Sequence, residues 1–169
     1  MPIEVRHARP GEGRRFEEIR IAGWRAGYAG MLKASLLDAL EVTDERVDQW
    51  ESLIRDAPGS GTLLLAEDDG AAIGGAVVLP SRDDDLPDAA ELAALYVDPC
   101  AWRRGAGSAL LAEGFERMPH PVQLLWVLAR NEGARRFYER HGFVVDGAFK
   151  LVDRGGEQVE VRYLRTRLD

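Results

Sequence analysis

The chain has 169 residues, of which 46% are hydrophobic and 30% are charged, and its net charge at pH 7 is −7. This composition is typical of one folded domain and excludes an intrinsically disordered chain, while the negative charge argues against a general nucleic-acid binder. No apolar run is long enough to span a bilayer, and Cys100 is the only cysteine, so we expect a cytoplasmic protein without disulfides or a membrane partner.

The first half of the chain predicts a strand, three helices and a hairpin. Alternating apolar residues predict a strand over 3–8, and apolar residues at helical spacing predict a helix from about residue 12. The end of that helix carries Trp24 and Tyr28, whose spacing favours core packing, with the wall of a substrate pocket as the alternative. There follow a short helix at 32–40, a helix capped by Thr43 and ending near 56, a turn at 58–61, and a hairpin of strands 62–67 and 72–79.

The second half begins with a polar connection at 81–88 that contains four aspartates. Such an acidic run is typical of a solvated loop, and attraction of a cationic substrate is the alternative. The expected elements after it are a strand at 92–97, a helix opening near Gly107, a buried strand at 122–128, a helix from Asn131 to about 139, and a hairpin of 143–152 and 158–168. This order predicts a single mixed α/β domain over 1–169.

The stretch 91–111, ELAALYVDPCAWRRGAGSALL, indicates function most directly. A strand leads into an Arg- and Gly-rich loop at a helix N-terminus, where free backbone N–H groups can hold phosphate. Residues 100–141 carry a charge of +3, so the remainder carries −10. This asymmetry favours a site for a small polyanionic ligand, although arginines on exposed helix faces would give the same composition.

Three other interpretations of the glycine loop can be compared with its spacing. A P-loop needs a lysine after its last glycine, but the only lysines are Lys33 and Lys150. A dinucleotide fingerprint needs a third glycine, but Gly105-Ala106-Gly107 is followed by Leu110 at that position. A plain connection between strand and helix, without a ligand, remains open.

Two linked motifs resemble the GCN5-related N-acetyltransferase (GNAT) family. The family has Gln/Arg-x-x-Gly-x-Gly/Ala after its fourth strand, then an Asn, then a helix with Ala-x-x-Phe-Tyr-x-x-x-Gly-Phe. VDPCAWRRGAGSALL and WVLARNEGARRFYERHGF match these motifs, with Trp102 departing from the first position. The resemblance covers nearly the whole chain and implies an acyl-CoA N-acyltransferase fold, with a central, mixed, twisted sheet of about seven strands flanked by helices.

The resemblance also implies how acetyl-CoA, the expected co-substrate, is held. Backbone N–H groups of the loop would bind the pyrophosphate, and a bulge near Leu95–Val97 would present an N–H to the acetyl carbonyl. Asn131 would contact the pantetheine arm, and we place Arg135 of the same helix with it. The complete expected cofactor-binding set is Leu95, Tyr96, Val97, Arg103, Arg104, Gly105, Ala106, Gly107, Ser108, Asn131, Arg135 and Tyr138.

Two residues are expected to act in catalysis. Tyr138 matches the general acid of the family, because a phenol is a proton donor at neutral pH; a core tyrosine is the alternative. Glu91, at the start of the fourth strand, is the candidate general base, directly or through water, with a solvated strand-end glutamate as the alternative. His141 is expected to end its helix, and Cys100 has no neighbouring base, so direct transfer is preferred to an acetyl-cysteine intermediate.

These expectations describe an enzyme with an unidentified acceptor. The resemblance implies an acceptor that lies against the first helices and the last hairpin, so the candidate acceptor-binding residues are Trp24, Tyr28 and Glu160, and no metal is expected. The predicted activity is acetyl transfer from acetyl-CoA to a primary amine of a small molecule or peptide, in a ternary complex, by a monomer or homodimer. The competing hypothesis is an acyl-CoA-binding module that has lost catalysis and serves regulation or interaction.

Overall fold

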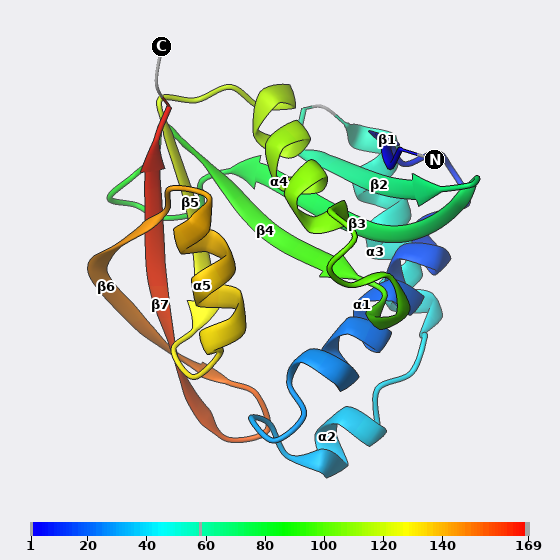
Figure 1. The fold of residues 1–169 in the computed structure, drawn as a ribbon, viewed down its shortest axis with the longest axis horizontal. Helices are drawn as coiled ribbons and strands as arrows, with labels where there is room; N and C mark the ends of the chain where they lie inside the picture. Colours follow the sequence, from blue (N-terminus) through cyan, green and yellow to red (C-terminus); the bar gives the residue numbers. More distant parts are fainter. Residues whose placement is uncertain (1, 58, 168–169) are drawn as a thin grey trace.

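A seven-stranded mixed sheet runs through the computed structural model, which describes residues 2–57 and 59–167 (Figure 1). The strand order is β1-β2-β3-β4-β5-β7-β6, and within this order only β4 and β5 are paired in parallel. The strands are β1 (Glu4–His7), β2 (Thr62–Asp68), β3 (Ala71–Pro80), β4 (Ala89–Val97), β5 (Val122–Leu128), β6 (Val144–Asp153) and β7 (Glu157–Thr166). The mixed α/β class and the seven-stranded sheet are therefore confirmed.

Helices cover both faces of the sheet. They are α1 (Gly13–Gly27), α2 (Ala34–Asp38), α3 (Asp44–Asp56), α4 (Ala106–Arg117) and α5 (Glu132–Arg140), with a 3₁₀ turn, η1 (Pro99–Ala101), before α4. Thr43 caps α3 as expected, because its side chain accepts a hydrogen bond from the Arg46 N–H at 3.3 Å. The short second helix is shorter than the expected 32–40, and both Pro58 of the expected turn and Leu168 of the last expected strand lie outside the described residues.

The two larger hydrophobic clusters of the described residues lie on opposite faces of the sheet. Phe16 of α1 and Ile54 of α3 pack with inward-facing side chains of β2 and β3, including Leu63. On the other face, α4 and α5 pack over a larger apolar cluster that contains Phe115 and Phe143. A Cβ atom at Gly114 of α4 would lie 2.8 Å from Val78 Cγ2, so glycine allows this helix to approach β3 closely.

The parallel strands β4 and β5 separate along their length, and this separation positions the site. They pair only from Ala89↔Val122 to Leu92↔Leu125, and the following part of β4 continues along β3 alone (Figure 1). The pairing with β3 shifts register at the same point, because Val78 faces Leu92 whereas Val77 faces Ala94. The extra residue, Ala93, forms a bulge, which lies earlier in the strand than the expected Leu95–Val97.

The bulge also explains the apolar pattern of β4. Simple alternation would place Leu92 and Leu95 on opposite faces of the sheet, but one inserted residue brings both to the α4 side. Ala94 and Tyr96 consequently face α1 and α3.

None of the described helices is long and apolar enough to cross a membrane.

Candidate active site

A cavity of about 930 Å³ opens where β4 and β5 separate. Its walls come from the second half of β4, the end of β5, the last turn of α1, the glycine loop before α4, and one side of α5. Apolar and aromatic walls with a few convergent polar groups are typical of small-molecule sites. The expected site residues can therefore be compared with the lining of one cavity.

The glycine loop has the backbone geometry of an anion cradle. Arg103 and Gly105 adopt positive φ angles of 64° and 94°, which turn the chain sharply before α4 begins. The backbone N–H groups of residues 103–108 donate to no acceptor within the described residues. Six consecutive unused donors at a helix N-terminus, on the wall of a cavity, can bind a diphosphate.

The sequence around α5 fixes the orientation of Tyr138. Asn131 caps the helix, because its side chain accepts a hydrogen bond from the Ala134 N–H at 3.1 Å. Asn131 also lines the cavity. At the other end, the N–H groups of Gly142 and Phe143 donate to the Glu139 and Tyr138 carbonyls, and Gly142 has a φ of +84°. These are the two bonds of a Schellman motif, so Gly142 ends the helix as expected.

Tyr138 can donate a proton or a hydrogen bond from the cavity wall. Burial, with smaller contributions from the Tyr28 and Tyr96 phenols, raises the pKa of Tyr138 above its usual value, so it is neutral at pH 7. Its hydroxyl makes no hydrogen bond to any residue in the described part of the chain, which leaves it available to a ligand. Burial also raises the pKa of Tyr28 and of Tyr96, which line the same cavity.

His141 joins the end of α5 to the glycine loop. Its Nδ1 lies 2.8 Å from the Phe137 carbonyl oxygen, and its Nε2 lies 3.0 Å from Ser108 Oγ. The Phe137 ring packs against the imidazole with 4.5 Å between centroids, and it also covers Gly107, where a Cβ would lie 3.5 Å away. The loop and the helix that carries Tyr138 therefore form one connected unit.

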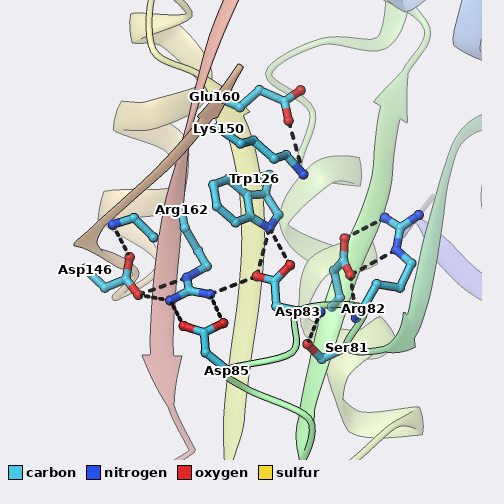
Figure 2. Close-up of polar contacts among 11 residues, drawn as sticks. Ser81, Arg82, Asp83, Asp85, Trp126, Asp146, Lys150, Glu160 and Arg162 are labelled. Atoms are coloured by element: carbon cyan, nitrogen blue, oxygen red, sulfur yellow. Dashed lines mark hydrogen bonds and ion pairs between the residues drawn. The ribbon is translucent and has the colours of Figure 1, made fainter. Parts of the chain in front are cut away.

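The end of the cavity opposite the glycine loop is aromatic and contains a carboxylate. Trp24 and Tyr28 meet edge to face at 5.0 Å, and Trp126 of β5 and Glu160 of β7 complete this wall. Glu160 is 9% exposed, and among the described residues it is the only acidic side chain that lines the cavity. Its carboxylate lies 3.6 Å from Lys150 Nζ, which in turn lies 4.2 Å from the centre of the Trp126 ring (Figure 2).

An ion-pair cluster, which we call the Arg162 cluster, stands behind this wall. Arg162 of β7 binds the carboxylates of Asp83, Asp85 and Asp146 at 2.7–2.9 Å (Figure 2). The same Asp83 accepts a hydrogen bond from Trp126 Nε1 at 3.0 Å. Asp83 and Asp85 belong to the acidic connection 81–88, and both are paired with the buried guanidinium of Arg162. At these two positions the connection is therefore neither a simply solvated loop nor open to a cation.

Most of the expected site residues line the cavity, and three do not. Glu91 is 3% exposed, lies outside the lining, and is bound through both oxygens by Arg82, at 2.6 and 3.1 Å. Arg104 forms an ion pair with Asp68, and Arg135 donates to the Tyr163 hydroxyl and the Ala129 carbonyl. The expected residues that do line it are Trp24, Tyr28, Leu95, Tyr96, Val97, Arg103, Gly105, Ala106, Gly107, Ser108, Asn131, Tyr138 and Glu160.

The position of Glu91 does not support the role expected for it as a direct base. Its carboxylate anchors the connection 81–88 to β4 through Arg82, and this half-exposed ion pair satisfies a charged residue that stands inside a strand. Asp98 accepts a hydrogen bond from the Cys100 N–H, and it raises the pKa of the exposed Cys100 thiol. A raised pKa disfavours the thiolate, in keeping with direct transfer without a cysteine nucleophile.

Sequence reasoning missed Trp126 and gave no site role to His141. Trp126 was hidden inside a continuous apolar run that predicted a strand buried on both faces, and only its indole N–H distinguished it from its neighbours. Trp102, which departs from the loop motif, donates from Nε1 to the Val97 carbonyl at 2.8 Å. Its indole thus braces the loop against the end of β4.

Comparisons with known proteins show the family and the fold of the chain. A family model described as "Acetyltransferase (GNAT) family" matches residues 26–143. The chain belongs to the GNAT acetyltransferase family. A probable N-acetyltransferase of Mycobacterium tuberculosis is 31% identical over 147 residues, which cover 86% of this chain and 82% of that protein.

Solved structures of other GNAT proteins share the fold. The PaiA N-acetyltransferase of Thermoplasma acidophilum, solved with coenzyme A, has a TM-score of 0.78 at 20% identity and covers 99% of this chain and 100% of its own. YncA, a putative acetyltransferase of Salmonella typhimurium solved with acetyl-CoA, has a TM-score of 0.72 at 22% identity, over 97% of this chain and 93% of its own. At these identities the likeness establishes the fold of this GNAT chain rather than its substrate.

Proposed function

We propose that this protein transfers the acetyl group of acetyl-CoA to a primary amine by direct attack in a ternary complex. The observation that carries the proposal is the lining of one cavity. The unused N–H groups of residues 103–108 lie at one end of the cavity, and the carboxylate of Glu160 lies at the other end. The neutral phenol of Tyr138 lies on the wall between them. These are the groups that a thioester, its leaving thiolate and an incoming amine require.

The residues present fit coenzyme A. The cradle at 103–108 supplies donors for the pyrophosphate, and the unpaired edge of β4 beyond Leu92 supplies backbone groups for the pantetheine arm. Asn131 stands beside that path at the start of α5. Acetyl-CoA would supply an acyl carbon that is activated as a thioester.

Groups of the chain itself would lower the activation barrier of acetyl transfer at two atoms, the acetyl oxygen and the thioester sulfur. An N–H of the bulged segment around Ala93 would stabilise negative charge that develops on the acetyl oxygen, as a preorganised donor. When the amine nitrogen bonds to the acetyl carbon and the carbon–sulfur bond breaks, the Tyr138 hydroxyl would give a proton or hydrogen bond to sulfur. Its hydroxyl is available because no described residue engages it.

Glu160 replaces Glu91 in our assignment of the acceptor end. A carboxylate that is 9% exposed, flanked by Trp24, Tyr28 and Trp126, can hold an ammonium group by charge and by the aromatic faces. It can then accept a proton from the amine, directly or through water. An amine-bearing small molecule or peptide side chain fits this chemistry.

A thiol-release assay with acetyl-CoA and a panel of amines tests the proposal. We expect release that depends on both acetyl-CoA and an amine, and on the Tyr138 hydroxyl. Tight coenzyme A binding without release for any amine would refute it in favour of an acyl-CoA-binding module.

A further inference from the structure

The contacts of His141 fix the proton positions between α5 and the glycine loop. A carbonyl oxygen only accepts hydrogen bonds, so the Nδ1 that lies 2.8 Å from the Phe137 oxygen must carry a hydrogen. In the neutral imidazole Nε2 is then an acceptor, and Ser108, whose Oγ lies 3.0 Å away, donates its hydroxyl hydrogen to it. Ser108 lines the cavity beside the cradle.

This arrangement is unsuited to an anion. With its hydrogen given to His141, the Ser108 hydroxyl turns only oxygen lone pairs toward the place where a phosphate would sit. If Nε2 is protonated instead, the imidazolium donates to Ser108 Oγ, and the serine hydrogen is released to donate to phosphate. The added proton comes from solvent, and Ser108 keeps its own.

We propose that His141 is a positioning residue that takes up a proton when the diphosphate of coenzyme A binds, and thereby turns the Ser108 hydroxyl into a phosphate donor. The proposal rests on the proposed function, since it takes the cradle at residues 103–108 as the diphosphate site. Its geometric basis is the chain of contacts from the Phe137 carbonyl through the imidazole to Ser108.

The charge of the ligand explains why the proton would arrive with it, and the neighbours of His141 are as follows. Arg165 of β7 donates to the His141 carbonyl at 2.8 Å, and Arg140 precedes it on α5. Glu139, the nearby acidic residue on α5, accepts from the Tyr163 hydroxyl at 2.7 Å. A diphosphate bound at the cradle would place negative charge next to Ser108 and the imidazole, which favours the protonated form of His141.

Calorimetric titration with 3′-dephospho-CoA tests the inference. This probe keeps the diphosphate but lacks the phosphomonoester, which itself titrates near pH 6. Titrations at pH 6–8 in buffers with different heats of ionisation measure the protons taken up per ligand bound. We expect net uptake by the wild type, with an affinity that falls with rising pH by at most about tenfold per unit.

Three variants assign the proton. His141→Asn and Ser108→Ala should each abolish the uptake and flatten the pH dependence, whereas His120→Asn should leave both unchanged, since His120 contacts the Asp88 carbonyl instead. Proton uptake that persists in either His141→Asn or Ser108→Ala would overturn the inference. The uptake is a property of each variant's binding reaction, so a modest loss of stability does not imitate it. If the wild type binds neither CoA nor 3′-dephospho-CoA, the result would instead refute the proposed function and, with it, this assignment.

Discussion

Replacing Arg162 by methionine should destabilise the protein in a way that depends on pH. The Arg162 side chain is 7% exposed and neutralises three carboxylates, of which Asp83 and Asp146 are 16% and 20% exposed. Removing one partner of a fully buried ion pair costs several kcal/mol of stability, but solvent reaches these carboxylates. We therefore expect the free energy of unfolding to fall by about 2 kcal/mol at pH 7. Asp85 is 64% exposed and is given no share of this loss.

The sign of the pH dependence follows from the aspartates. Hydrogen bonds from Arg162 lower the pKa of Asp85, and they lower that of Asp146 against the opposing effect of burial. The resulting stability is therefore present above the unfolded-state value of about 3.9 and is lost as the pH falls through the lower folded values. The free-energy difference between wild type and Arg162→Met should shrink between pH 5 and pH 3.

Urea denaturation at pH 7, 5 and 3 measures this difference. Arg136→Met is a matched control, because Arg136 pairs with Glu132 at 3.5 Å on an exposed helix face, where we expect at most about 0.5 kcal/mol. A loss of less than 1 kcal/mol for Arg162→Met at pH 7, or one that is the same at all three pH values, would refute the reasoning.

Three predictions concern the cavity itself. Tyr138→Phe should lower kcat by roughly a hundredfold or more without a matching change in the acceptor KM, as steady-state kinetics would show, and an unchanged kcat would exclude the acid role. Glu160→Gln should raise the acceptor KM by about tenfold, equivalent to roughly 1.4 kcal/mol, while the KM for acetyl-CoA stays constant. Gly105→Ala should weaken coenzyme A binding in a calorimetric titration and destabilise the loop by about 1 kcal/mol, since φ is +94° there; equal affinity would contradict the cradle.

The sequence was sufficient to predict the sheet and its helices because local signals agree there. Thr43 and Asn131 cap their helices with the side-chain bonds that their residue types favour, and Gly142 closes α5 at a positive φ. The bulge was expected from the family resemblance, with support from the spacing of Leu92 and Leu95, but its position was not. Only an extra residue between the two leucines brings both to one face, and the pairing with β3 places it at Ala93.

The glycine-loop wall of the cavity was predictable because one continuous segment forms it, whereas Trp126 and Lys150 near Glu160 were not. Trp126, Glu160 and Lys150 come from three strands whose registers place Trp126 opposite Arg162 and Lys150 opposite Glu160. No local pattern contains those pairings. The pairing of Glu91 was not visible in the sequence for a related reason, since only the folded chain brings Arg82 onto both of its oxygens.

The distribution of acidic groups argues for how the acceptor is chosen. An acidic run such as 81–88 could attract any cation, but Arg162 engages Asp83 and Asp85 and ties the connection to β7 instead. Attraction at the cavity then rests on Glu160, which shares its charge with Lys150 and Arg154. Because a carboxylate so compensated gives little long-range attraction, the proposed amine would have to reach Glu160 and displace part of that pairing. Selection under this proposal would depend on close fit against Trp24, Tyr28 and Trp126, and a bulky or diffuse cation would gain nothing from the acidity of the chain as a whole.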